Sequence, residues 1–64
     1  MAINLKKGQK VKYTNGNLGV YEGEIVWING RQLIVIGDSD EMILWKMGYA
    51  VGASIVESQI IEIV

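Results

Sequence analysis

The only cluster of carboxylates in the 64-residue sequence comprises Asp38, Asp40 and Glu41. An Asp-x-Asp spacing can bind Mg²⁺ or Ca²⁺ through its oxygen atoms, or can provide an acid/base pair. The cluster follows Gly37, and Gly, Asp and Ser are also the usual residues of a polar turn. Because three carboxylates supply fewer ligands than a dedicated cation site, we expect a turn here, with no metal and no cofactor.

A second pair of carboxylates, Glu22 and Glu24, shares one face of a predicted strand, where a solvated role is more common than a catalytic one. The sequence contains no His and no Cys, so it lacks an imidazole base and a thiol nucleophile. Gly48 and Gly52 are not followed by the Lys-Ser or Lys-Thr of a phosphate-binding loop. We therefore predict a protein that is not an enzyme.

Basic residues concentrate in the first half of the chain, although the formal net charge is −1. Proteins that bind single-stranded nucleic acids combine basic strands with aromatic side chains that stack on bases. The candidates for such a ligand-binding surface are Lys6, Lys7, Lys10, Lys12, Tyr21 and Tyr49. The aromatic residues, with Glu22 or Asp40, could instead form a cage for a methylated cation. The acidic balance of the whole chain argues against affinity based on phosphate neutralisation.

Length and composition predict a single domain, residues 1–64, that needs a stabilising feature beyond an ordinary hydrophobic core. A chain of this size buries only about 60% of its unfolded surface. Without Cys or His, disulfides and the commonest zinc ligands are excluded, which leaves self-association or an unusually apolar core. The longest apolar runs span four residues, so we expect no membrane span and a cytoplasmic location.

The residue types favour strands, because Ile and Val supply seventeen residues and β-branched side chains suit a pleated surface. Glycines divide the chain into short segments, and Asn29-Gly30 predicts a type I′ turn between two apolar runs. No long helix is expected. We predict a short helical turn over 57–59 and strands over 9–14, 19–28, 31–36, 41–47, 53–56 and 60–64.

Both faces of the central hairpin are predicted to be apolar. Strict alternation places Ile25 and Trp27 on one side and Val26 and Ile28 on the other. In the same way, Leu33 and Val35 face one side, and Ile34 and Ile36 face the other. Since no helix is predicted to cover the second face, we expect a second copy or a partner protein to do so. The candidate interface residues are Trp27, Ile28, Ile34 and Ile36.

Four segments together resemble the small SH3-like barrel shared by Tudor, KOW, chromo-like and many short bacterial or phage proteins. They are Gly8-Gln9-Lys10-Val11-Lys12-Tyr13, Tyr21-Glu22-Gly23-Glu24-Ile25-Val26, Ile43-Leu44-Trp45 with Gly48, and Ile55-Val56-Glu57-Ser58-Gln59-Ile60. The resemblance implies a bent second strand and a one-turn helix before the last strand. The second of these segments, together with Gly48-Tyr49-Ala50-Val51, also resembles the type II plasmid dihydrofolate reductases. The Val-Gln-Ile-Tyr strand of those enzymes has no counterpart here, where the sequence reads Ala53-Ser54-Ile55-Val56-Glu57, so their activity is not carried over.

The sequence therefore predicts an all-β, SH3-like small barrel of five or six short antiparallel strands. We expect a non-catalytic binding or accessory module, of a phage or bacterial type, that self-associates and interacts with a protein partner. The alternative is a nucleic-acid-associated module that uses its Lys-rich first strand.

Overall fold

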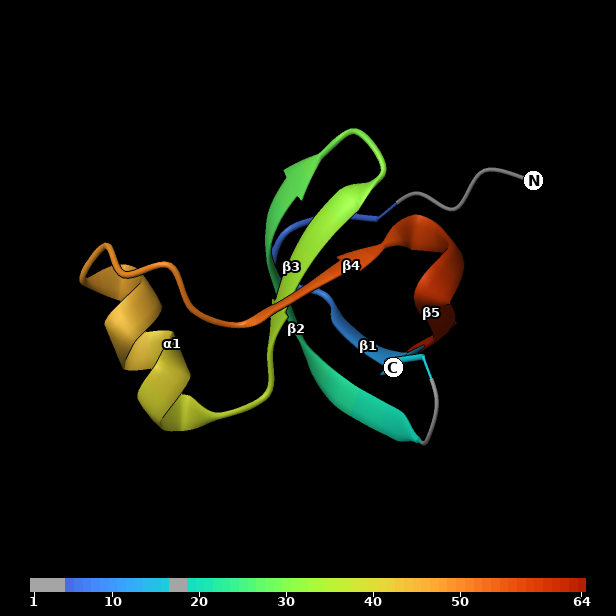
Figure 1. The fold of residues 1–64 in the computed structure, drawn as a ribbon, viewed down its shortest axis with the longest axis horizontal. Coiled ribbons are helices and arrows are strands. Elements are labelled where there is room, and N and C mark those ends of the chain that lie inside the picture. Colours follow the sequence, from blue (N-terminus) through green and yellow to red (C-terminus); the bar gives the residue numbers. More distant parts are fainter. Residues whose placement is uncertain (1–4, 17–18) are drawn as a thin grey trace.

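Five antiparallel strands form one sheet in the computed structural model, which describes residues 5–16 and 19–64. The elements are β1 (Lys10–Thr14), β2 (Val20–Asn29), β3 (Gln32–Ile36), α1 (Ser39–Lys46), β4 (Ala53–Val56), the 3₁₀ turn η1 (Glu57–Gln59) and β5 (Ile60–Ile63). The strand order is β4-β3-β2-β1-β5, with α1 set to one side of the sheet (Figure 1). The predicted all-β class without a long helix is confirmed for the described residues.

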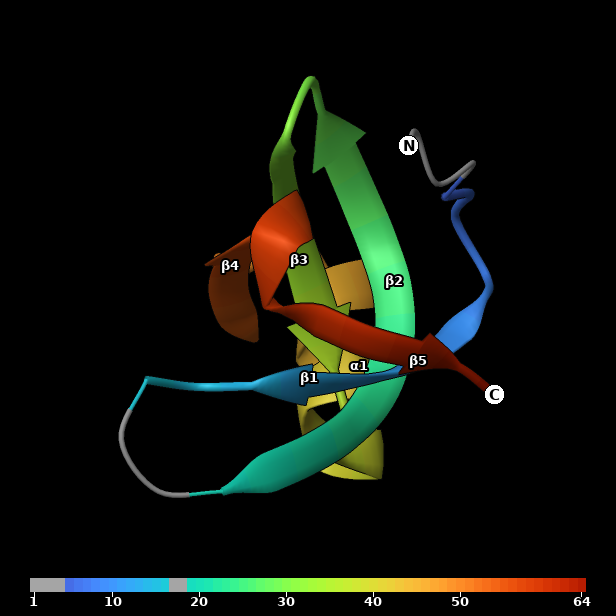
Figure 2. The same cartoon turned by 90° about the vertical axis from the view of Figure 1, so that its right-hand side faces the viewer.

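The ten-residue strand β2 links the two halves of the sheet. Its first half pairs with β1, its second half pairs with β3, and Glu24 has a partner on both sides. Figure 2 shows β2 curving, with β1 and β5 across its lower half and β3 beside its upper half. Gly23 lies next to the change of partner, where a Cβ atom would be 2.7 Å from Cγ1 of Val35. Glycine is therefore required by the close approach of β3.

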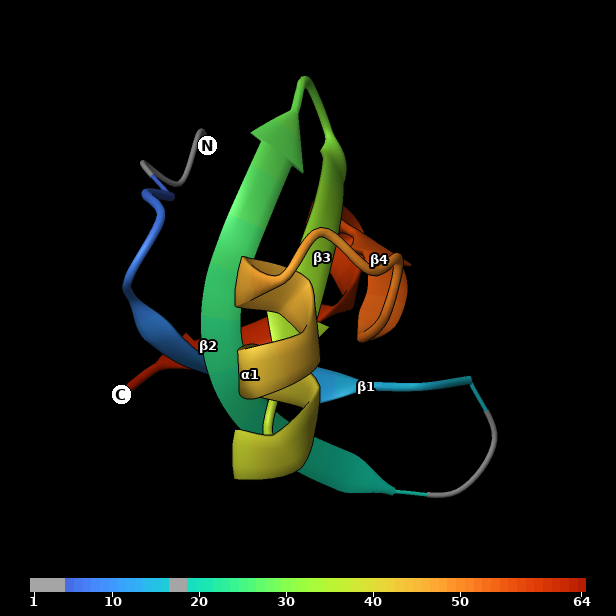
Figure 3. The same cartoon turned by 90° about the vertical axis from the view of Figure 1, so that its left-hand side faces the viewer.

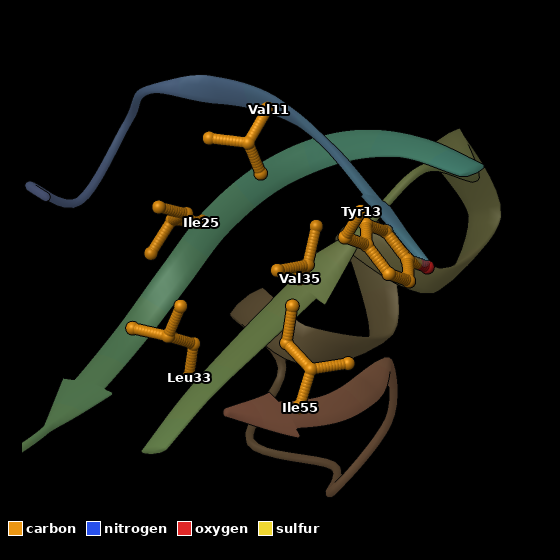
Figure 4. Packing of buried hydrophobic residues seen from close by; sticks show 6 residues of the cluster. All are labelled: Val11, Tyr13, Ile25, Leu33, Val35 and Ile55. Carbon is orange, nitrogen blue, oxygen red and sulfur yellow. The ribbon is translucent and has the colours of Figure 1, made fainter. Parts of the chain in front are cut away.

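The core lies on the inner side of this curve. Its buried side chains come from the first four strands and point toward one another in Figure 4; they are Val11, Tyr13, Ile25, Leu33, Val35 and Ile55. Leu5, Ile28, Ala53 and Ile60 pack against this cluster. In β1, Val11 and Tyr13 face this core and alternate with the more exposed Lys10, Lys12 and Thr14.

An irregularity in β2 changes the predicted faces of the central hairpin. Ile25 pairs with Val35, but the next pair is Trp27 with Ile34, followed by Ile28 with Leu33. A β-bulge sets two residues of one strand against one of its partner, so the alternation shifts by one position. Ile28 therefore packs against the same core as Ile25, and the prediction that these two residues lie on opposite faces is wrong.

The hairpin between β2 and β3 is confirmed, but its predicted turn type is wrong. Asn29 pairs with Gln32, which leaves Gly30 and Arg31 as the two central residues of the turn. Gly30 has a φ of 64°, whereas no non-glycine residue among those described has positive φ. A type I′ turn needs positive φ at both central positions, and a type II′ turn needs it only at the first. The observed signs are those of type II′.

The predicted strand over 41–47 is also wrong, because these residues form most of α1. Asp38 caps the helix by accepting a hydrogen bond from the backbone N–H of Asp40 at 2.9 Å. At the other end, Gly48 has a φ of 98°, its N–H donates to the carbonyl of Trp45, and the N–H of Tyr49 donates to that of Leu44. This pair of hydrogen bonds is a Schellman motif. Local capping thus defines both ends of the helix.

The segment from α1 to β4 covers part of the outer face of the sheet. Figure 3 shows α1 in front of β2 and β3, and Ile36 at the end of β3 is only 3% exposed. A Cβ atom at Gly52 would lie 2.8 Å from Cγ1 of Ile36 and 3.0 Å from Cγ2 of Ile34. The expectation that no helix covers the second face is therefore wrong, and Ile36 is covered by its own chain.

The two edge strands are tied together through η1, at the position predicted for a helical turn. The Gln59 side chain accepts a hydrogen bond from the N–H of Val56 at 2.9 Å and donates one to the carbonyl of Thr14 at 2.8 Å. The N–H of Glu57 donates to the carbonyl of Arg31 at 2.8 Å. These bonds connect the end of β4 with β1 and with the β2–β3 hairpin.

Candidate interaction surface

Helix α1 has no buried residue, although half of its eight residues are apolar. We define the α1 face as the exposed apolar side chains of the helix and the turn that follows it: Ile43 (58% exposed), Leu44 (39%), Met47 (65%) and Tyr49 (56%). Met42 and Trp45, on the other side of the helix, are half-buried. A surface helix normally buries its apolar stripe and turns a polar face to solvent, whereas α1 is apolar on both sides.

A cleft of about 410 Å³ lies beside α1, between the helix and the outer face of the sheet. Ile36, Met42 and Ile43 contribute apolar walls. The charged side chains around it are Lys10, Glu22, Glu24 and Asp38. Because three carboxylates face one ammonium group, the cleft favours a cationic group over an anionic one.

The lysines of β1 are surrounded by carboxylates from the neighbouring strands. Lys10 pairs across the sheet with Glu24, and Lys12 pairs with Glu22 on one side and with Glu62 on the other. Nζ of Lys12 lies 3.9 Å from Oε1 of Glu62. The structure therefore brings Lys10 and Lys12 together on one face, but it places negative charge beside each of them.

Lys6 and Lys7 precede β1 and are exposed. The backbone N–H of Lys6 donates to Oε1 of Gln9 at 2.7 Å, and the N–H of Gly8 donates to the carbonyl of Ile25 at 2.8 Å. These bonds anchor the segment beside β2. The two lysines thus extend the basic side of β1 toward the N-terminus.

The two candidate tyrosines lie on different elements. Tyr21, in the first half of β2, has its ring centroid 5.8 Å from that of Tyr13. Tyr49 follows α1 and belongs to the α1 face. Burial raises the pKa of Tyr13 above the usual tyrosine value, and the nearby Tyr21 and Glu41 raise it further. Tyr21 thus packs against a core residue, whereas Tyr49 is open to a partner.

The predicted interface residues are less accessible than the α1 face. Trp27, Ile28 and Ile34 are half-buried, and Ile36 is buried. The α1 face itself was missed, because the run from Met42 to Trp45 was interpreted as a strand. The signals that could have revealed it are Asp38 before the run, Lys46 at its end and Gly48 just beyond.

Each carboxylate of the Asp38, Asp40 and Glu41 cluster has a role in the start of α1. Asp38 is the N-cap, and Asp40 and Glu41 lie in the first turn, where negative charge is favourable. Oε2 of Glu41 also accepts a hydrogen bond from the N–H of Gly52 at 3.3 Å. Within residues 5–16 and 19–64, no group of three or more His, Cys, Asp or Glu side chains is arranged to hold a metal ion.

Comparison with protein-family models, curated proteins and solved structures finds no match to this chain. In the part of the chain that the structure describes, no helix is long and apolar enough to cross a membrane. The candidate function therefore depends on the geometry of the chain itself.

Proposed function

We propose that this chain is a small, non-catalytic, cytoplasmic protein-interaction module that self-associates. The observation that carries the proposal is the α1 face: two large apolar side chains stay exposed on a helix with no buried residue, and two more stay exposed in the turn that follows it. Contiguous apolar patches on soluble proteins commonly mark interaction sites. A chain this short also gains stability when a partner covers such a patch.

The scaffold of this module is proposed to be an SH3-like barrel. Three features support the proposal: the strand order β4-β3-β2-β1-β5, the curvature of β2, and the turn η1 between the two edge strands. The hydrogen bonds of Gln59 hold the end of β4 near the end of β1, as the closing of such a sheet requires. On this reading, α1 is an insertion between β3 and β4 that carries the interaction surface.

Sedimentation velocity over a hundredfold range of protein concentration tests the proposal. We expect the weight-average sedimentation coefficient to rise with concentration, because association is reversible. In parallel, a cell lysate is passed over the immobilised protein to recover partners. A strictly monomeric profile at every concentration, with no partner retained, would contradict the proposal.

A second candidate function is nucleic-acid binding, which the exposure of Lys6, Lys7 and Lys10 favours. Fluorescence anisotropy with a labelled single-stranded oligonucleotide at two salt concentrations provides the test. If this function operates, binding weakens steeply with salt and is lost when Lys10→Glu and Lys12→Glu are combined. Lys46→Glu, on α1, is the control. Binding that is equal in all three proteins excludes the β1 surface.

A further inference from the structure

We infer that α1 is the contact between two copies of this chain, packed antiparallel about a two-fold axis that passes between Ile43 and Leu44. The inference deepens the proposed self-association by naming its surface and its partner. It rests on three features of the helix: the spacing of its exposed residues, the distribution of its charges and its length.

Four of the exposed residues of α1 and its C-cap have the spacing of a helix-packing stripe. They are Asp40, Ile43, Leu44 and Met47, at positions i, i+3, i+4 and i+7. Residues at this spacing lie on one side of a helix. Ile43 and Leu44 are at the centre of the stripe, so two antiparallel copies bring these residues together, whereas Met47 of each copy approaches Asp40 of the other.

The charges of α1 favour the antiparallel arrangement. Asp38, Asp40 and Glu41 are at the N-terminal end, and Lys46 is the basic residue of the last turn. An antiparallel pair places Lys46 of each copy near the acidic end of the other, and it also opposes the two helix dipoles. A parallel pair would bring like charges together. The helix is thus complementary to itself in one orientation only.

The length of α1 sets the strength of the contact. It has eight residues, whereas stable protein interfaces commonly use roughly 20–30 residues on each side. Even with Tyr49 and the flanking turn, the contact is smaller than a standard protein–protein interface. We therefore expect a weak, concentration-dependent dimer rather than an obligate one.

Cysteine cross-linking tests the geometry directly, because the sequence contains no cysteine. Ile43→Cys lies next to the proposed axis, so the two thiols come within disulfide distance. Ile61→Cys on β5 is the matched control, since Ile61 is 55% exposed and is also apolar. After mild oxidation of the full chain, a non-reducing gel should show a covalent dimer for Ile43→Cys at low protein concentration. Cross-linking of Ile61→Cys alone would overturn the inference.

Disruption of the surface separates this inference from the proposed function. Ile43→Lys and Lys46→Glu should each weaken the dimer by about tenfold or more in sedimentation equilibrium, while the matched changes Ile61→Lys and Lys7→Glu leave it unchanged. Because α1 buries no residue, both variants should keep the circular dichroism of the folded sheet.

The outcomes distinguish the two claims. Self-association that persists unchanged in folded Ile43→Lys overturns the α1 contact but leaves the module self-associating through another surface. A wild-type chain that is monomeric at every concentration overturns the inferred dimer. If this monomer binds a different protein, and Ile43→Lys abolishes that binding, the α1 face is an interaction surface for that protein instead. Loss of the dimer only in the α1 variants supports both claims.

Discussion

Gln59 joins the end of the edge strand β4 to the end of β1 through one side-chain amide. Its oxygen receives the N–H of Val56, and its nitrogen donates to the carbonyl of Thr14. These two backbone groups come from segments that are far apart in the sequence. A single side chain thus connects two strands, β4 and β1, that are not neighbours in the sheet.

Replacing Gln59 with alanine should destabilise the protein by about 1–3 kcal/mol, since two backbone groups lose their partners. Urea unfolding monitored by tryptophan fluorescence measures the change. Ser58→Ala in the same turn is the control, because Ser58 is exposed. A Gln59→Ala protein as stable as the control would mean that water replaces both bonds at no cost.

Gly23 should tolerate no side chain. A Cβ atom there would lie 2.9 Å from the carbonyl oxygen of Ile36, in addition to its contact with Val35. Gly23→Ala should therefore destabilise the fold by about 1–3 kcal/mol through overpacking. Gly19→Ala is the matched control, because its Cβ would meet Tyr21 only at 3.9 Å. Equal unfolding midpoints in urea for the two variants would contradict the close approach of β2 and β3.

Tyr13 should make the stability depend on alkaline pH. Because burial raises the pKa of Tyr13 in the folded state, the unfolded chain loses this proton first as the pH increases. The contribution of Tyr13 to the free energy of unfolding is therefore complete below about pH 10 and decreases above it. In urea unfolding from pH 7 to 11, Tyr13→Phe should lose less stability than the wild type. Tyr49→Phe should follow the wild type, because Tyr49 is exposed.

Helix α1 is defined by its ends rather than by its packing. Its N-cap, its acidic first turn, its basic last turn and its Schellman motif all stabilise the helical backbone locally. The sheet receives no buried side chain from it. Helix α1 can thus unfold locally with little effect on the core.

Asp38→Ala should weaken α1 by about 1 kcal/mol, because the N–H of Asp40 loses its acceptor. Hydrogen exchange of the α1 amides, including that of Met47, should accelerate, while exchange in β2 stays close to wild type. Asp40→Asn provides a control that leaves the cap in place. Equal acceleration in β2 and α1 would show that the helix and the sheet unfold as one unit.

At the scale of the whole molecule, a small core is combined with a large exposed apolar surface. Six buried side chains form the core cluster, whereas the α1 face and the C-terminal residues Ile61, Ile63 and Val64 remain open. Small domains with limited burial are marginally stable alone. Association should therefore contribute measurably to the stability of the fold.

The thermal midpoint should rise with protein concentration in the wild type, because dimer formation draws the equilibrium toward the folded state. Circular dichroism melts over a hundredfold concentration range measure this dependence. In Ile43→Lys the midpoint should be independent of concentration, whereas Ile61→Lys should keep the slope. A wild-type midpoint that does not change would show that association adds no stability.

The strand pattern, the hairpin and the turn η1 followed from the sequence by itself. The predicted strand over 53–56 coincides with β4, and those over 9–14 and 31–36 each begin one residue before β1 and β3. Alternating apolar residues and glycine-rich turns are local signals, so they identify such elements without reference to the rest of the chain. The sequence also identified the Lys-rich strand. It did not show that the strand register places Glu22, Glu24 and Glu62 beside the lysines of that strand.

Only the tertiary structure decided the bulge in β2 and the cover over Ile36, and it also settled the state of residues 41–47. A run of four apolar residues by itself suits a buried strand as well as a short helix, so the prediction depended on how the flanking Asp38, Lys46 and Gly48 were weighed. The open side of β3 is paired with β4, which leaves no edge of that strand for the run to join. Capping at Asp38 and Gly48 then favours the helix, and Ile43 and Leu44 remain exposed because they lie on the side of α1 opposite the half-buried Met42 and Trp45.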